Sequence, residues 1–212
     1  MVSLVDQGKC AVIGEVVNQA VLEASSKGAS IRSAEVAIAG LGVLSELGED
    51  GMRYRLRAGT VGFRMSTQTA PWALIYPEMK GRSGESGPVY VWIEEFSQDA
   101  SGKREQRKIV DFSCRHWDTY RSAAMSVNRL DDVVRPDLEY PHVLWGEADS
   151  FSDLCQYSHR KSALKRFQQD FCENQDSFID LLTVALVLAR ESSGSTDIYD
   201  AKFKFQPDEW FR

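Results

Sequence analysis

The spacing of apolar residues changes from helical to alternating near residue 50, and that change limits the folds that the sequence can adopt. Before it, apolar residues recur at helical spacing over 10–25 and again over 33–47. After it, apolar residues alternate with arginines in "MRYRLR" from Met52, which is the pattern of a half-buried strand. Helices and antiparallel strands that occupy separate parts of a sequence favour an α+β domain.

The remaining patterns continue this segregation. A run at 60–65 extends the first strand past a glycine, and further strands are predicted at 72–76, 89–96 and 106–114, the last two as a β-hairpin. An irregular, proline-containing segment covers 129–147. Two helices follow it, an amphipathic one over 158–171 and a strongly apolar one over 176–191. The aromatic residues of the tail are expected to pack back onto the body.

The chain is long enough for one substantial core, so we expect a single domain over 1–212. Its core is predicted within 8–114, as N-terminal helices packed on an antiparallel sheet, with a C-terminal helical extension over 115–212. The hydrophobic fraction of 43% and the charged fraction of 26% are those of a globular chain and not of a disordered one.

Charge and hydropathy argue against several classes of partner. A net charge of -6 without a long basic block is unfavourable for binding nucleic acid. The longest apolar run, which starts at Phe178, is interrupted by Asp180 and is too short to cross a bilayer. The first residues lack the pattern of an export signal, so we expect a cytoplasmic protein with free thiols. The cysteines and histidines show no zinc-like spacing, and we expect neither a metal nor another cofactor; the oligomeric state is left open.

Four polar or aromatic residues of the predicted hairpin share one face of the sheet. If the turn is centred on residues 100 and 101, Asp111 lies opposite Tyr90; if it is shifted by one residue, Asp111 lies opposite Trp92. Because side chains alternate between faces, Tyr90, Trp92, Glu94 and Asp111 point to the same side in both registers.

Cys10 lies where the first helical pattern begins. The unpaired N–H groups and the partial positive charge at a helix N-terminus lower the pKa of a thiol and can hold an oxyanion. Cys10 is therefore a candidate nucleophile, which would need a base and a group that orients the base. The alternative is an ordinary buried thiol, which behaves as a small apolar side chain.

The order of these elements resembles the transglutaminase-like branch of the papain-like cysteine-protease superfamily. The resemblance covers roughly 8–114 and is carried by Cys10, by Trp92 and Glu94 in "VYVWIEEF" and by Asp111 in "VDFS". It implies a papain-like fold with Cys10 as nucleophile, Asp111 as the orienting acid, and Trp92 and Glu94 at the substrate cleft. Asp111 as the partner of an arginine and Trp92 as a core residue are the structural alternatives.

Tyr90 occupies the position at which this family carries its catalytic histidine. Tyrosine has a pKa of about 10 and is a poor base near neutral pH. Either the alignment is shifted, or another histidine supplies the base, or the site has lost its chemistry. His116 and His142 are the candidate bases, and each also has a structural interpretation. His159 is expected at the exposed start of a helix.

Two functions therefore remain open. In the first, the protein is a papain-like cysteine hydrolase or acyltransferase that acts on an amide or ester bond of a peptide, a protein or a small molecule. In the second, a catalytically inactive papain-like fold serves as a binding or regulatory module. The first predicts a histidine within hydrogen-bond reach of the Cys10 sulfur. The second predicts that Tyr90 packs over Cys10 and that its hydroxyl reaches Asp111 or the thiol.

Overall fold

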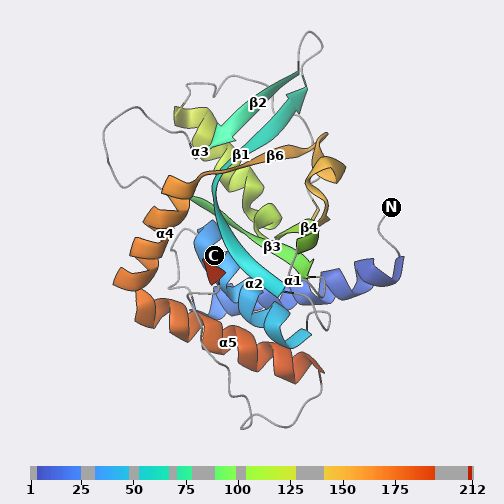
Figure 1. The fold of residues 1–212 in the computed structure, drawn as a ribbon, viewed down its shortest axis with the longest axis vertical. Coiled ribbons are helices and arrows are strands. Elements are labelled where there is room, and N and C mark those ends of the chain that lie inside the picture. Colours follow the sequence, from blue (N-terminus) through green and yellow to red (C-terminus); the bar gives the residue numbers. More distant parts are fainter. Residues whose placement is uncertain are drawn as a thin grey trace.

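The computed structural model describes residues 4–24, 32–47, 53–66, 71–77, 89–98, 104–127, 141–193 and 210–211. Within these ranges the protein has five α-helices, two short 3-10 helices and a six-stranded sheet whose strand pairs are all antiparallel (Figure 1). The α+β class and the antiparallel sheet predicted from the sequence are therefore confirmed.

The helices differ from the sequence prediction mainly in their bounds. They are α1 (Leu4–Ala24), α2 (Ser33–Leu47), α3 (Trp117–Val127), α4 (Lys161–Glu173) and α5 (Gln175–Ser193), with the 3-10 helices η1 (Ser113–His116) and η2 (Ala148–Phe151). Helix α2 has the predicted bounds. Helix α1 begins six residues before Cys10, which corrects the expectation that this cysteine starts the helix. The sequence patterns do not predict α3.

The strands form one continuous sheet. They are β1 (Arg53–Ser66), β2 (Pro71–Tyr76), β3 (Tyr90–Gln98), β4 (Arg104–Asp111), β5 (Leu144–Gly146) and β6 (Cys155–His159). Their order is β2-β1-β3-β4-β5, and β6 pairs with β1. The predicted hairpin is confirmed as β3 and β4, although its turn lies outside the described residues. The register pairs Ile93 with Val110, so Asp111 falls opposite Trp92 and not opposite Tyr90.

Two apolar clusters cover the two faces of the sheet. The first cluster joins apolar residues of α1, α2 and α5 to Leu56 of β1 and Val91 of β3. The second cluster contains Phe63 and Trp92 of the same two strands, together with Trp117 of α3. Because successive strand residues point to opposite sides, each strand contributes to both clusters. Figure 1 shows α1, α2 and α5 grouped together, away from α3.

The environment of the arginines in β1 differs from the sequence prediction. The alternating pattern from Met52 predicts a strand with its arginines on a solvated face. Arg53 is exposed as expected, but Arg55 keeps only 2% of its surface accessible. Its guanidinium pairs with Glu94 and lies 5.0 Å from the ring centroid of Phe96. The strand is therefore covered on both faces at this point.

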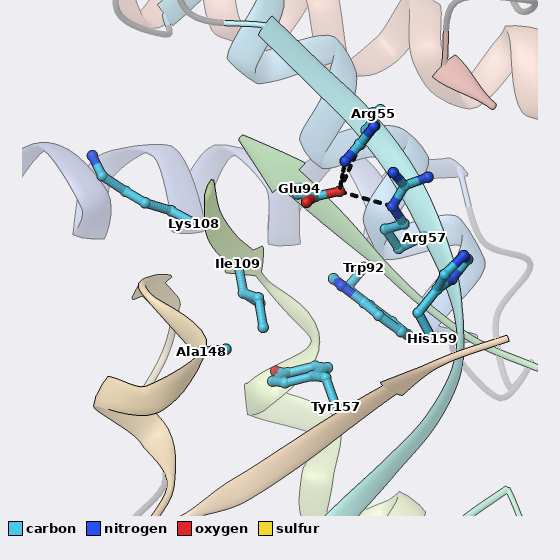
Figure 2. A pocket seen from close by; sticks show the side chains of 9 residues that line it. All are labelled: Arg55, Arg57, Trp92, Glu94, Lys108, Ile109, Ala148, Tyr157 and His159. Atoms are coloured by element: carbon cyan, nitrogen blue, oxygen red, sulfur yellow. Dashed lines mark hydrogen bonds and ion pairs between the residues drawn. The ribbon is translucent and has the colours of Figure 1, made fainter. Parts of the chain in front are cut away.

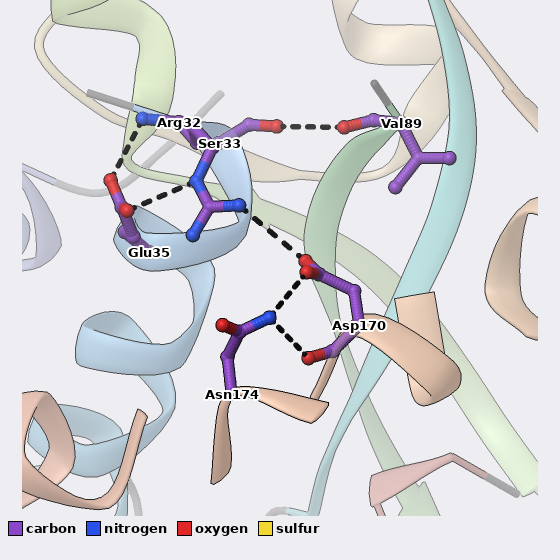
Figure 3. A network of polar contacts seen from close by, with 6 residues as sticks. All are labelled: Arg32, Ser33, Glu35, Val89, Asp170 and Asn174. Carbon is purple, nitrogen blue, oxygen red and sulfur yellow. Dashed lines mark hydrogen bonds and ion pairs between the residues drawn. The ribbon is translucent and has the colours of Figure 1, made fainter. Parts of the chain in front are cut away.

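Polar contacts connect the start of α2 to the start of β3 (Figure 3). The backbone N–H and the guanidinium Nε of Arg32 each donate to the Glu35 carboxylate at 3.0 Å, which closes the first turn of the helix. The hydroxyl of Ser33 donates to the carbonyl oxygen of Val89 at 3.4 Å and accepts from the N–H of Val91 at 3.1 Å. These contacts position the first residues of β3, where the site described below begins.

The segment after residue 114, expected as a helical extension of a core within 8–114, also contributes to the sheet. Strand β5 pairs with β4, and β6 pairs with β1. Helix α5 packs on α1 and α2, and its apolar residues belong to the first cluster. Trp210 and Phe211 pack against that cluster as predicted for the tail, whose other aromatic residues lie outside the described residues.

Gly59 pairs with two neighbouring strands at once, with Tyr90 of β3 and His159 of β6. A Cβ added there would overlap the carbonyl oxygen of Ser158. We predict that Gly59→Ala lowers the free energy of unfolding, measured by urea denaturation, by about 1–3 kcal/mol, the usual cost of overpacking.

The matched control is Gly8→Ala in α1, where an added Cβ meets nothing within 4 Å. Alanine is favoured over glycine inside a helix by up to about 1 kcal/mol, so this variant should be as stable as the wild type or slightly more stable. Equal losses in the two variants would contradict a specific clash at Gly59.

Candidate functional site

The carboxylate of Asp111 is buried and receives three hydrogen bonds. The hydroxyls of Tyr90 and Tyr157 donate to its Oδ2 at 2.7 and 2.6 Å, and the backbone N–H of Ser113 donates to its Oδ1 at 2.7 Å. The indole Nε1 of Trp117 donates in turn to the Tyr90 hydroxyl at 2.7 Å. This network joins β3, β4, β6, η1 and α3 on the side of the sheet that carries the second cluster.

Burial controls the protonation of this network. It raises the pKa of Asp111 above its ordinary value, although the hydrogen bonds from Tyr157 and Tyr90 act in the opposite direction. Burial and the nearby Asp111 raise the pKa of Tyr90 well above its usual range, and the same two causes raise that of Tyr157. Both tyrosines are therefore neutral donors at physiological pH, and Tyr90 does not replace histidine as a base.

The structure does not place Cys10 on this side of the sheet. Cys10 is half-buried in the second turn of α1, so its N–H group is not among the four unpaired N–H groups at the helix start. Residues one turn further along the helix, such as Ile13, belong to the first cluster. The Asp111 carboxylate points to the second cluster, which covers the opposite face. The helix-terminus argument for a thiolate at Cys10 therefore no longer applies.

The two candidate bases lie in different places. His116 is in η1, half-buried, with its ring centroid 6.4 Å from that of Tyr120, and burial lowers its pKa. His142 is exposed and lies beside α1. The next residue, Val143, occupies the space that a side chain at Gly14 would need. Neither histidine is among the groups that donate to Asp111 in the described part of the chain.

A pocket of about 310 Å³ opens beside the Asp111 network, over β1, β3 and β6 (Figure 2). Its lining residues are Arg55, Arg57, Trp92, Glu94, Lys108, Ile109, Ala148, Tyr157 and His159. The Tyr157 ring belongs to both features, because it forms part of the pocket wall while its hydroxyl holds Asp111. Trp92 and Glu94, the two cleft residues proposed from the sequence, both line this pocket.

Two arginines hold Glu94 at the pocket wall. The Nε atoms of Arg55 and Arg57 donate to the same carboxylate oxygen, Glu94 Oε2, at 2.5 and 2.7 Å. Burial alone would raise the pKa of Glu94, but the hydrogen bond from Arg55 and the charge of Arg57 outweigh it, and the pKa lies below its ordinary value. Glu94 is therefore ionised, and its two partners are held in fixed positions.

Aromatic rings form the opposite side of the pocket. The Trp92 ring centroid lies 5.2 Å from that of Tyr157 and 6.3 Å from that of His159, edge to face with the imidazole. Nδ1 of His159 lies 3.0 Å from the carbonyl oxygen of Ala58. Burial lowers the pKa of His159, so the ring is neutral at pH 7; Nδ1 then carries the proton and donates to Ala58.

The sequence patterns did not identify four residues of this site. Tyr157 and His159 lie on β6, a strand of five residues that contains only one strongly apolar side chain and is placed by pairing with β1. His159 is exposed as expected, but it ends β6 and does not begin a helix, because α4 starts at Lys161. Arg55 and Arg57 were predicted to face solvent. The sequence did offer a signal for the arginines: two of them lie on one predicted strand, opposite an acidic residue on the adjacent predicted strand.

Comparisons with protein-family models, with curated proteins and with solved structures found no match to this chain. Among the helices described here, none combines the length and apolar character that crossing a membrane requires. Within the same residues, no three His, Cys, Asp or Glu side chains form a group that could hold a metal ion.

We predict that Tyr90→Phe destabilises the protein by about 1–3 kcal/mol, because a buried acceptor loses one of its donors. Chemical denaturation at pH 7 measures this loss. The control is Tyr76→Phe, which keeps the ring stacked on Tyr120 and removes a hydroxyl that makes no hydrogen bond in the described part of the chain. The control should change stability by less than about 0.5 kcal/mol. A loss no larger than this in Tyr90→Phe would contradict the network.

The raised pKa of Asp111 predicts a particular pH dependence. The native state binds this proton more tightly than the unfolded state, so the contribution of Asp111 is greatest at low pH. It falls as the pH rises from near 3.8 through the raised native pKa and is constant above it. The difference in unfolding free energy between wild type and Asp111→Asn should follow this course between pH 3 and pH 8. A difference that grows with pH would show a lowered pKa instead.

Proposed function

We propose that this protein is a non-catalytic binding or regulatory module whose ligand occupies the pocket over β1, β3 and β6. The observation that carries the proposal is the environment of Asp111. Two neutral tyrosine hydroxyls and a backbone N–H occupy its carboxylate, and none of these three donors can act as a general base. The contact from Tyr90 to Asp111 is one that the non-catalytic alternative predicts. Its other expectation, that Tyr90 packs over Cys10, is wrong, because Tyr90 belongs to the second cluster and α1 packs in the first.

The position of Cys10 supports the same proposal. A cysteine nucleophile, its base and the acid that orients the base must be in direct contact with one another. Here α1 packs in the first cluster, whereas Asp111 faces the second. A base held by Asp111 would therefore lie on the wrong side of the sheet to accept a proton from Cys10.

The pocket provides the features expected of a small-molecule site. It is concave and lined by apolar and aromatic side chains with a few fixed polar groups, and its volume is at the lower end of the range for such sites. The arginines are positioned by Glu94 and Tyr157 by Asp111. Little rearrangement is needed before a ligand binds, which reduces the entropic cost of association.

A second candidate is the cysteine hydrolase or acyltransferase with Cys10 as nucleophile and His142 as base. It is favoured by the place of His142 beside α1, where Val143 abuts Gly14, one turn from Cys10. The thiolate would attack an amide or ester carbonyl, His142 would return the proton to the leaving group, and water would release the acyl group. In this arrangement Asp111 has no part in orienting the base.

Alkylation of the four thiols separates the two candidates. We predict that iodoacetamide modifies exposed Cys172 first and Cys10 no faster, as followed by peptide mass spectrometry against pH. Cys114 and Cys155 should react only on unfolding, since both are buried and burial raises the pKa of Cys155 to about 12. Cys10→Ala should leave ligand binding unchanged.

A different result would support the cysteine hydrolase or acyltransferase. Fast reaction of Cys10 with an apparent pKa well below the ordinary value of about 8.5 would indicate a thiolate. If that reactivity also disappeared in His142→Ala, the non-catalytic proposal would be overturned.

A further inference from the structure

In the described part of the chain, strand β6 pairs with β1 and with no other strand. At the end of this pairing, the N–H of Arg160 donates to the carbonyl oxygen of Ala58 at 3.0 Å. Hydrogen-bonded and non-bonded pairs alternate along an antiparallel ladder, so Ser158 also bonds to β1, whereas Tyr157 and His159 do not. The main-chain N–H and C=O groups of Tyr157 and His159 therefore point away from β1.

These main-chain groups form an open sheet edge. Within the residues that the structure describes, the N–H and C=O groups of Tyr157 and His159 make no hydrogen bond. The side chains of Gln156 and Ser158, which alternate with them, are exposed. A row of unpaired main-chain groups at a sheet edge is a template for a further strand. The edge of β6 can therefore accept a partner that offers its own main chain.

The same edge borders the pocket. Tyr157 and His159 both line it, and Figure 2 shows their side chains extending from β6 beside it. Trp92, Ile109 and Ala148 contribute apolar surface to the other walls. When a protein binds a peptide by strand addition, main-chain hydrogen bonds supply affinity and adjacent pockets select side chains. This site has both components.

The shape of the site favours one extended chain segment over a second copy of this protein. The edge adjoins a hollow of about 310 Å³, and Ala148 of η2 lines the same hollow. Helix η2 contacts both β5 and β6, so it forms a wall beside the edge. A second copy would bring the rest of its sheet with its edge strand. A single segment needs only the spacing of one strand, about 4.8 Å, beside β6.

We propose that this site binds an extended peptide, which adds to β6 as an antiparallel strand. The peptide residues opposite Tyr157 and His159 exchange main-chain hydrogen bonds with them. Residues directly opposite each other share a face of the sheet, so these two peptide side chains point to the pocket. Because the pocket walls include Trp92, Ile109 and Ala148, a large apolar side chain is favoured there. The inference rests on the proposed binding function and adds the class of ligand.

Amide hydrogen exchange, followed by NMR of 15N-labelled protein, tests the edge directly. In the protein alone, the N–H groups of Tyr157 and His159 should exchange at least about tenfold faster than those of Gln156 and Ser158, which bond to β1. The probes are the capped pentapeptides Thr-Val-X-Val-Thr, in which X is Leu, Phe or Trp. At least one should bind saturably and slow the exchange of Tyr157 and His159 more than that of Gln156 and Ser158.

Methylated peptides test the main-chain bonds. With the side chain of X in the pocket, the N–H of X points to β6 and the N–H groups of both valines point away from it. Methylation of the X nitrogen should weaken binding at least about fivefold, because a carbonyl oxygen of β6 loses its donor. Methylation of the second valine nitrogen is the matched control and should weaken binding less than about twofold.

A pair of protein variants tests the same bonds from the other side. His159→Pro removes an N–H group that pairing with β1 does not use, a position at which an edge strand tolerates proline. His159→Ala removes the same imidazole but keeps the N–H group. The proline variant should therefore bind the peptide at least about fivefold more weakly than the alanine variant. If His159→Pro does not fold, the two methylated peptides supply the comparison.

Three results would overturn the inference: no saturable binding of any of the peptides, equal affinity of the two methylated forms, or binding that leaves the exchange of Tyr157 and His159 unchanged. Protection of these two N–H groups that rises with protein concentration, without peptide, would also overturn it and would identify a second copy as the occupant.

Failure of the proposed function is a separate outcome, because it depends on the reactivity of Cys10. A slow Cys10 without peptide binding removes the ligand class alone. A fast, His142-dependent Cys10 removes the non-catalytic proposal even where a peptide binds to β6.

Discussion

The buried carboxylate of Asp111 is the constraint on which the rest of this structure depends. A carboxyl group in an apolar setting is costly unless hydrogen bonds replace its water, and here two tyrosines and a backbone N–H do so. These donors come from β3, β6 and the start of η1, segments far apart in the sequence. Satisfying one carboxylate therefore helps to fix how the hairpin, the short strand β6 and the chain after β4 meet.

Strand β1 has a central position in this arrangement. It pairs with β2, β3 and β6, and its side chains enter both apolar clusters. Because β6 lies beside it, Tyr157 and His159 come next to Trp92, and a pocket forms where the arginines of β1 face Glu94. The half-buried Glu94 carboxylate is also held by partners on a neighbouring strand, and these are two arginines, which neutralise its charge.

The two faces of the sheet also separate the groups that a cysteine hydrolase would need. The helix that carries Cys10 belongs to the first cluster, while Asp111, Tyr90 and the pocket belong to the second or lie beside it. Tyrosine at position 90 suits this arrangement, since it is a neutral donor to a buried acid and is itself held by Trp117. The proposed module would bind its ligand on the side of the sheet that carries Asp111 and Tyr90.

The sequence alone determined the α+β class, the helix over 33–47, the β3–β4 hairpin and the shared face of Tyr90, Trp92, Glu94 and Asp111. Each follows from local periodicity, which backbone geometry imposes on every helix and strand. Only the tertiary structure decided that Arg55 is buried, that β6 brings His159 beside Trp92, and that Cys10 and Asp111 face opposite sides. Those outcomes depend on which distant segments pair and what covers each face of the sheet. Contacts between distant segments are not encoded in local periodicity. The pairing of the short, polar strand β6 and the side of the sheet on which Cys10 lies could therefore not be predicted from it.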